Sequence, residues 1–452
     1  MAHYQETPLG PFAAAGIGSR ETILGLLSQR LGGMEEEIRS FRDECARLWW
    51  ESEAEFPSLP RRYDFRSQKA VERDLLGFVD RIAGRLEPGR RESDVVDSLV
   101  EELRSFGQSF LDLAEGEVDT VFRREFVDST RAFLDRAVEF DPQLSIEDAY
   151  QALRNVWIMN TLQVYLGREI RCTDAVFAYS LIYPYTDNVL DSGSETAGSK
   201  LGLGVKLRRW LEGRDEEAES AGDERVRRLV RLIESQYPRD EFPGVYGSLL
   251  GIFNAQMRSL FQQSRSSYPY EMDILGISLE KGGTSVLADG YLVGGRLNPR
   301  EADFCFGFGA FLQLADDIQD TKADRRGDHM TLFSQTAGRF PLDRLAGKLF
   351  GFMSRIVEEK LSSDRPSEAA LRNVILKNAV WLVLEAVGRN REYFSRSYAA
   401  RAQKHFPVRF SFRRRLRRKL EKSLLRRRKT VADLDVTTAV LLTAASRVLS
   451  QR

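Results

Sequence analysis

Three aspartates follow a long apolar stretch of this chain. Residues 304–315 are nearly all apolar, and Asp316, Asp317 and Asp320 come directly after them. An α-helix repeats every 3.6 residues, so Asp316 and Asp320 share one face of a helix and Asp317 lies beside them. Carboxylates this close repel one another and raise one another's pKa unless a cation lies between them. The pattern therefore predicts a buried helix whose acidic end faces a cavity.

A second acidic helix end is expected earlier in the chain. Asp187 and Asp191 are four residues apart and share a helix face, and Asn188 adds a neutral oxygen beside them. A lone pair of this kind is most often a solvated surface feature. Aromatic residues just upstream and a second acidic helix end later in the chain favour a metal-binding role instead.

Glycines interrupt two helical patterns. Residues 282–283 are both glycine and directly follow Lys281, while Gly307 and Gly309 lie in the apolar stretch. Each glycine inside a helix costs about 1 kcal/mol, so such residues indicate a break or a close approach of another backbone. A broken helix at 282–283 would expose backbone amides and carbonyls to a ligand. An ordinary glycine-rich turn fits this stretch equally well.

Helical patterns extend over almost the whole chain, and strand-like alternation is hard to find. An all-α protein is therefore expected. Ser145 with Asp148 predicts one helix start, and Thr173 predicts another. The expected helices cover residues 20–53, 68–86, 91–113, 118–140, 145–165, 173–191 and 246–263.

Composition is that of an ordinary globular protein. The 452 residues are 42% hydrophobic and 30% charged, with a formal net charge of zero, which gives nucleic-acid binding no support. Cys45, Cys172 and Cys305 lack metal-ligand spacing and are expected to be buried thiols. The N-terminus has no signal-peptide layout and no uncharged apolar run reaches eighteen residues, so a cytoplasmic protein is expected.

Together these elements resemble the class I isoprenoid synthase superfamily. Residues 312–320, Leu-Gln-Leu-Ala-Asp-Asp-Ile-Gln-Asp, are similar to the Phe-Gln-x-x-Asp-Asp-x-x-Asp signature of its second aspartate-rich motif. Residues 187–191, Asp-Asn-Val-Leu-Asp, look like a variant of the first motif, and Lys281 with Thr284 resembles the Lys-Thr pair of prenyltransferases. The resemblance covers residues 145–336. It implies a large helical bundle around a central active-site cavity.

Departures from the family pattern bear on the reaction. The first motif is Asp-Asn-x-x-Asp, residues 192–195 are Ser-Gly-Ser-Glu where chain-elongating enzymes carry Arg-Arg-Gly, and no N-terminal Gly-Lys-x-x-Arg segment is present. The altered motif is similar to that of some bacterial large terpene synthases. The resemblance thus implies a terpene synthase that ionises one prenyl diphosphate and cyclises the cation or eliminates a proton. Two alternatives stay open: a prenyltransferase of the polyprenyl diphosphate synthase or squalene/phytoene synthase kind, and a non-catalytic lipid-binding or scaffold protein.

The resemblance also assigns roles to individual residues. A cluster of Mg²⁺ ions, with Mn²⁺ as a substitute, would be bound by Asp187, Asp191, Asp316 and Asp320, supported by Asn188 and Asp317. Lys281 would act in catalysis. The diphosphate would meet Lys281, Thr284, Gln313, Arg325, Arg326 and Arg258, although surface roles fit the arginines as well. The cavity wall would include Tyr179, Tyr183, Phe304, Phe308 and Phe311, which could equally be core residues.

A basic segment lies near the C-terminus. Twelve of the 21 residues in 409–429 are Lys or Arg, and Leu416, Leu420 and Leu424 form a stripe at helical spacing. A basic amphipathic helix suits an anionic membrane surface, which would make the protein membrane-peripheral. The alternative is a basic face packed on acidic parts of the same chain.

The expected organisation has three parts. Residues 1–75 form an N-terminal helical extension with a linker, residues 76–408 form the catalytic domain, and residues 409–452 form the basic C-terminal segment. A prenyl diphosphate is the expected partner, and the resemblance also allows a homodimer.

Overall fold

The computed structural model describes residues 33–85, 92–110, 112–191, 197–263, 272–361, 366–420, 422–423, 430–436 and 438–440. These residues form seventeen α-helices and no β-strand, apart from one antiparallel bridge between Ser145 and Thr430. The all-α prediction is therefore confirmed for this part of the chain. None of its helices is both long enough and apolar enough to cross a membrane.

The helices follow one another with short connections. The first nine are α2 (Gly33–Glu51), α3 (Phe65–Arg85), α4 (Glu92–Phe110), α5 (Glu115–Val121), α6 (Arg124–Phe140), α7 (Ile146–Tyr165), α8 (Asp174–Asp191), α9 (Ala197–Leu211) and α10 (Ala221–Gln236). The others are α11 (Pro243–Ser259), α12 (Ile274–Gly294), α13 (Pro299–Arg326), α14 (Leu332–Thr336), α15 (Asp343–Lys360), α16 (Pro366–Arg389), α17 (Arg396–His405) and α18 (Arg413–Leu420).

Local sequence explains several helix starts. The Ser145 hydroxyl accepts a hydrogen bond from the Asp148 amide, and the Thr173 hydroxyl accepts one from the Val176 amide, so both predicted caps are confirmed. The single helix predicted over 118–140 is wrong. The chain breaks at Phe122, whose φ of −104° and ψ of 56° end α5 before α6 begins. No glycine or proline marks this break, so residue types alone could not predict it.

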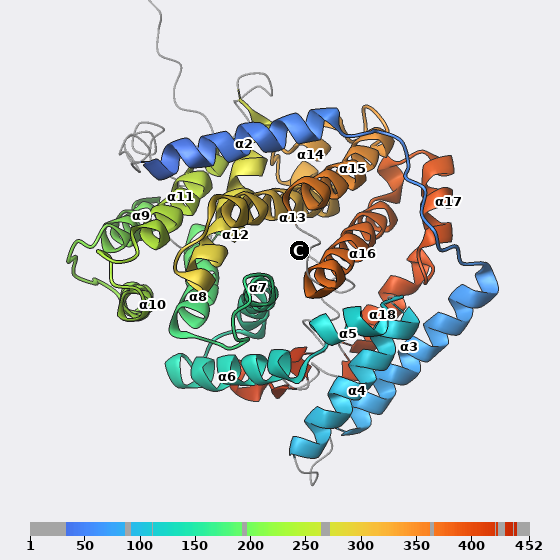
Figure 1. The fold of residues 1–452 in the computed structure, drawn as a ribbon, viewed down its shortest axis with the longest axis horizontal. Helices are drawn as coiled ribbons and strands as arrows, with labels where there is room; N and C mark the ends of the chain where they lie inside the picture. Colours follow the sequence, from blue (N-terminus) through green and yellow to red (C-terminus); the bar gives the residue numbers. More distant parts are fainter. Residues whose placement is uncertain are drawn as a thin grey trace, which may run out of the picture.

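Helices α12 and α13 form the centre of the molecule. They pack side by side beneath α2, with α11 against α12 and α15 against α13 (Figure 1). Gly282 and Gly309 face each other, because a Cβ atom on Gly282 would overlap the carbonyl oxygen of Gly309 and the reverse is also true. Helix α12 runs through Gly282 and Gly283 without interruption. The predicted break is therefore wrong, and the alternative of a close backbone approach is confirmed.

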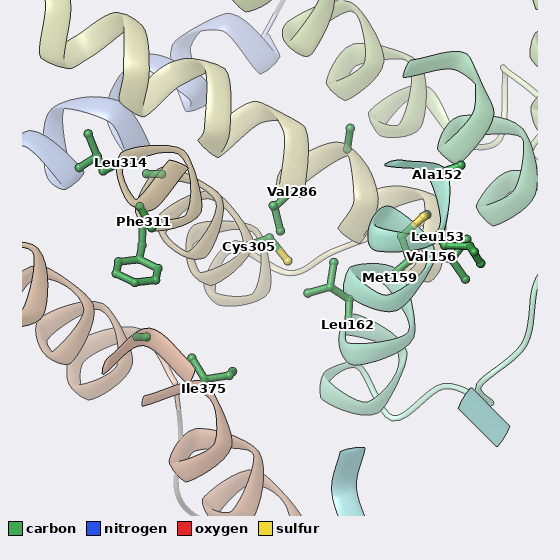
Figure 2. Close-up of a cluster of buried hydrophobic side chains, with 14 of the residues drawn as sticks. Ala152, Leu153, Val156, Met159, Leu162, Val286, Cys305, Phe311, Leu314 and Ile375 are labelled. Carbon is green, nitrogen blue, oxygen red and sulfur yellow. The ribbon is translucent and has the colours of Figure 1, made fainter. Parts of the chain in front are cut away.

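The core joins these central helices to their neighbours. Figure 2 shows part of it, in which Val286 of α12, Cys305 of α13 and Leu162 of α7 belong to one buried cluster. Cys45 and Cys305 are free, fully buried thiols and Cys172 is half-buried.

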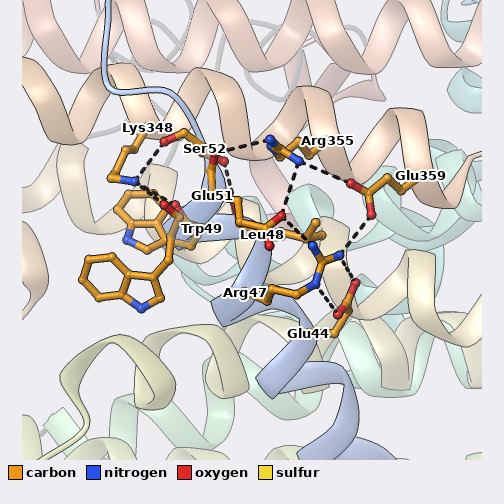
Figure 3. Close-up of polar contacts among 10 residues, drawn as sticks. Glu44, Arg47, Leu48, Trp49, Glu51, Ser52, Lys348, Arg355 and Glu359 are labelled. Atoms are coloured by element: carbon orange, nitrogen blue, oxygen red, sulfur yellow. Dashed lines mark hydrogen bonds and ion pairs between the residues drawn. The ribbon is translucent and has the colours of Figure 1, made fainter.

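Helix α2 belongs to this bundle although it lies in the predicted N-terminal extension. Leu48 and Trp49 are fully buried, and α2 packs on α11, α12, α13 and α15. Its C-terminal end is tied to α15, since the Lys348 ammonium donates to the carbonyl oxygens of Trp49, Trp50 and Ser52 at 2.9–3.1 Å (Figure 3). The described part of the extension is thus a structural component of the same body.

The basic C-terminal segment also packs on the bundle. Leu416 and Leu420 of α18 are buried, against helix α3 among others. Arg409 binds the buried Glu72 carboxylate at 2.6 Å, and Lys419 forms an ion pair with Asp80. In this part of the segment, the contacts agree with the alternative in which a basic face packs on acidic parts of the same chain. Leu424 lies outside the described residues.

Candidate functional site

The three aspartates at the end of α13 lie in different environments. Asp316 is exposed, Asp320 is half-buried, and only 6% of Asp317 is exposed. A metal ligand needs a side chain that an incoming ion can reach. By that criterion Asp316 and Asp320 are the candidates, and Asp317 has another role.

Asp317 joins α12 to α13. Its carboxylate accepts hydrogen bonds of 2.8 Å from the Ser278 hydroxyl of α12 and from the Gln313 side-chain amide. Burial raises the pKa of Asp317 to about 6, while the two hydrogen bonds oppose the shift. The amide of Gln313, a predicted diphosphate ligand, is thus engaged by Asp317.

Asp324 extends the acidic face by one more helical turn. Burial and the nearby charges of Asp317, Asp320 and Asp316 together raise its pKa to about 8, while the charge of Lys281 opposes them. Sequence reasoning did not select Asp324 as a site residue. The signal was present, because Asp316, Asp320 and Asp324 follow one another at intervals of four residues along one helix face.

Asp320 has a resident counter-ion. The Arg389 guanidinium of α16 lies 3.1 Å from its carboxylate. Arg389 also lies 3.7 Å from Glu385, and Glu385 lies 3.0 Å from Arg413 of α18. These four side chains, which we call the charge row, alternate in sign from the acidic face to the basic C-terminal helix.

Lys281 lies on α12 beside the acidic end of α13, since its charge acts on both Asp317 and Asp324. Thr284 does not accompany it as a ligand. This residue is fully buried, and its hydroxyl donates to the Glu280 carbonyl oxygen within the same helix at 2.7 Å. The predicted diphosphate contact of Thr284 is not available in this structure, because the unbroken helix turns the hydroxyl onto its own backbone.

The predicted arginines have other neighbours. Arg258 of α11 forms an ion pair with the buried Glu280 carboxylate, which also lies 3.6 Å from Arg42 of α2. Arg325 and Arg326 are exposed at the end of α13. The Arg325 guanidinium lies 5.1 Å from the centre of the Tyr393 ring, in a short 3₁₀ turn after α16. Arg325 is therefore a surface residue that contacts Tyr393.

An apolar pocket lies between α8, α9 and α11. Its empty volume is about 700 Å³ when the part open to solvent is included. Tyr179 and Tyr183 line it, whereas the predicted cavity residues Phe304, Phe308 and Phe311 are not among its walls. The walls consist of Tyr179, Ile182, Tyr183, Thr186, Leu203, Gly204, Leu207, Leu211, Leu249, Ile252, Phe253, Gln256 and Met257.

The three phenylalanines predicted to line the cavity lie in the core. Phe304 and Phe311 are about 1% exposed. The Phe304 ring stacks on that of Phe308 with centroids 5.9 Å apart, and it packs on Tyr165 at 4.6 Å. These contacts match the alternative reading of a phenylalanine-rich core helix.

Along the chain, the pocket borders the first predicted acidic end and Arg258, a predicted diphosphate ligand. Its α8 wall reaches Thr186, which precedes Asp187, and its α11 wall reaches Met257, which precedes Arg258. Asp187, Asn188 and Asp191 belong to the helical backbone of α8, and their side chains lie outside the described part of the structure. Whether the two acidic ends share one cavity therefore stays a prediction.

Polar groups lie behind the Tyr179 wall. Asp289 of α12 is fully buried, and one of its oxygens accepts a hydrogen bond of 3.1 Å from the Asn155 amide of α7. Its other oxygen has no hydrogen-bond partner among the described residues. Burial raises the pKa of Asp289 to about 8.

The donor atoms of the acidic face suit magnesium. Mg²⁺ prefers carboxylate oxygens, keeps several waters, and is usually bound through one or two carboxylates plus substrate phosphates. Asp316 and Asp320 offer such oxygens. No group of three His, Cys, Asp or Glu side chains able to hold a metal ion was found among the described residues, a search that does not cover Asp187 and Asp191. The α13 face can thus supply part of a metal site, to be completed by ligand oxygens.

No family model matches the sequence, and comparisons with curated proteins and with solved structures found no match.

Proposed function

We propose that this protein is a magnesium-dependent class I isoprenoid synthase of the terpene synthase kind. It ionises a prenyl diphosphate, releases diphosphate, and cyclises the allylic cation or removes a proton from it. The proposal rests on the resemblance of residues 145–336 and on the placement of the apolar pocket described above. It includes the fold type, a large bundle around the substrate cavity.

The observation that supports the proposal is an apolar pocket whose walls lead along the chain to the first acidic helix end and to Arg258. One wall leads from Tyr179 to Thr186 and continues into Asp187. On the other side, Arg258 pairs with Glu280, the neighbour of Lys281, and Lys281 lies beside the carboxylates of α13. An isoprenoid diphosphate has an apolar chain that suits the pocket and an anionic head that suits Lys281 and a metal ion on the carboxylates.

Each part of the site has a task in this reaction. Asp316 and Asp320 would hold magnesium, which when bound neutralises the charge developing on the leaving diphosphate. Lys281 supplies a fixed positive charge beside them. The apolar pocket shields the cation from water, and the faces of Tyr179 and Tyr183 can stabilise it electrostatically.

The test is incubation of the full chain with geranyl, farnesyl and geranylgeranyl diphosphates and Mg²⁺, with diphosphate release and extracted products measured together. Release of diphosphate with an isoprenoid hydrocarbon or alcohol is expected. Asp316→Asn should lower the rate at least roughly 100-fold, because it removes a metal ligand. Asp328→Asn is the matched control, since Asp328 is exposed just past the helix and its φ of 54° suits asparagine.

Two outcomes would point to the other functions. A longer diphosphate that forms only when isopentenyl diphosphate is added would identify a prenyltransferase. Absence of diphosphate release from every substrate, with ligand binding unchanged in Asp316→Asn, would identify a non-catalytic lipid-binding or scaffold protein.

A further inference from the structure

The charge row connects the acidic face of α13 to the C-terminal helix. Arg389 stands in its middle, 3.1 Å from Asp320 and 3.7 Å from Glu385. Arg389 is largely buried, with 12% of its side chain exposed. A single guanidinium is therefore shared by two carboxylates, only one of which belongs to the candidate metal site.

Glu385 is the second carboxylate and lies deep in the protein. Only 5% of Glu385 is exposed, and neither of its carboxylate oxygens accepts a hydrogen bond from the described residues. Its charge is balanced instead by Arg389 and by Arg413, which lies 3.0 Å away. A buried carboxylate without hydrogen bonds depends strongly on such neighbours, because removal of one partner leaves charge uncompensated in a poorly solvated place.

We propose that Arg389 is a competitor of the metal ion for Asp320, and that Glu385 and Arg413 are positioning residues that set how strongly it competes. This inference rests on the proposed function, since it assigns Asp320 to a cation site. Glu385 draws Arg389 away from Asp320, and Arg413 weakens that pull by sharing Glu385. The C-terminal helix thereby tunes cation binding at the opposite end of the row.

The arrangement predicts opposite effects for two neutral substitutions. Arg413→Gln leaves Arg389 as the main described partner of Glu385, so Arg389 moves toward Glu385 and Asp320 becomes more available to a cation. Glu385→Gln removes the carboxylate that draws Arg389 away from Asp320, so a cation must displace a stronger partner. Damage to the fold would weaken binding in both variants, which separates a positioning role from a merely structural one.

The probe is Mn²⁺ with inorganic diphosphate, and the free ion is followed by its electron paramagnetic resonance signal in titrations of the full chain. Arg413→Gln should lower the apparent dissociation constant about three- to tenfold, and Glu385→Gln should raise it by a similar factor. The double variant Glu385→Gln/Arg413→Gln should behave like Glu385→Gln and keeps the buried row neutral if the single variant does not fold. Arg414→Gln, on the exposed side of α18, is the matched control and should leave the constant unchanged.

The outcomes separate this inference from the proposed function. If the wild type binds Mn²⁺ and Asp320→Asn weakens that binding, but Arg413→Gln does not tighten it, the inference is wrong and the proposed function stands. If neither the wild type nor Asp320→Asn binds Mn²⁺ with diphosphate present, both are wrong.

Discussion

Asp289 carries a carboxyl group into the middle of the bundle with one hydrogen bond from Asn155. Its second oxygen has no partner among the described residues, and burial raises its pKa to about 8. The group is therefore protonated at neutral pH, as expected for a carboxyl group that lacks a counter-ion. Such a residue makes stability depend on pH.

The sign of that dependence follows from proton binding. Between the unfolded pKa of about 4 and the folded pKa of about 8, the folded chain holds a proton that the unfolded chain has lost, so the Asp289 contribution falls as pH rises. Asp289→Asn removes this pH-dependent loss of stability, because asparagine does not titrate. The unfolding free energy of the variant minus that of the wild type should rise by about 1.4 kcal/mol per pH unit from pH 5 to 7.

Urea denaturation of both proteins at each pH measures this difference. Asp135→Asn, on the exposed face of α6, controls for the loss of a surface carboxylate. A difference that stays constant across the range would show that Asp289 is ionised in the folded protein.

Residue roles were harder to predict than residue positions. The spacing of Asp316, Asp317 and Asp320 predicted their helix and its acidic end. It could not tell that Asp317 points to Ser278 of α12, because that contact spans 39 residues and depends on how two helices pack. The same applies to Thr284, whose role was predicted from the resemblance and whose hydroxyl instead donates to the Glu280 carbonyl oxygen.

At the scale of elements, the contact of α12 with α13 depends on glycine. The backbones of Gly282 and Gly309 meet so closely that neither position has room for a methyl group. Gly282→Ala should lower the unfolding free energy by about 3 kcal/mol, since the neighbouring atoms belong to backbone and cannot turn away. Chemical denaturation monitored by circular dichroism measures the loss.

A matched substitution should have the opposite sign. Gly202 of α9 has open space where a Cβ atom would lie. Gly202→Ala should raise the unfolding free energy by about 0.5 to 1 kcal/mol, because alanine is the better helix former. Equal effects at the two positions would contradict the close contact of α12 with α13.

The helices could be predicted from the sequence because apolar residues at helical spacing and cap residues such as Ser145 act locally. The gap between α5 and α6 could not be predicted, since neither Phe122 nor Arg123 is a helix-breaking residue and their conformation is set by packing. Gly282 and Gly283 were compatible with either a helix break or a close backbone approach. Only the packing of α12 on α13 decides in favour of the close approach.

At the scale of the whole molecule, the C-terminal helix is part of the folded body. Leu416 is 2% exposed, so Leu416→Ala should lower the unfolding free energy by about 2 to 4 kcal/mol. Arg415→Ala, on the exposed side of the same helix, should change it by less than about 0.5 kcal/mol. Unchanged stability of Leu416→Ala together with lost binding to anionic vesicles would instead support the membrane prediction.

The three-part organisation predicted from sequence treated both ends of the chain as additions. Composition suggested this, since proline-rich residues follow α2 and a basic stretch follows α17. What the composition could not indicate is that Trp49 and Leu416 enter the same core as α13.

The tie between α2 and α15 also affects how the chain is made. Lys348 binds the carbonyl oxygen of Ser52 across 296 residues, so a ribosome adding 5 to 20 residues per second needs roughly 15 to 60 s to supply this partner. During that time the α15 part of the core that covers Trp49 is missing. The apolar face of α2 is therefore only partly covered until α15 has been synthesised, so the N-terminal helix completes its packing late in synthesis.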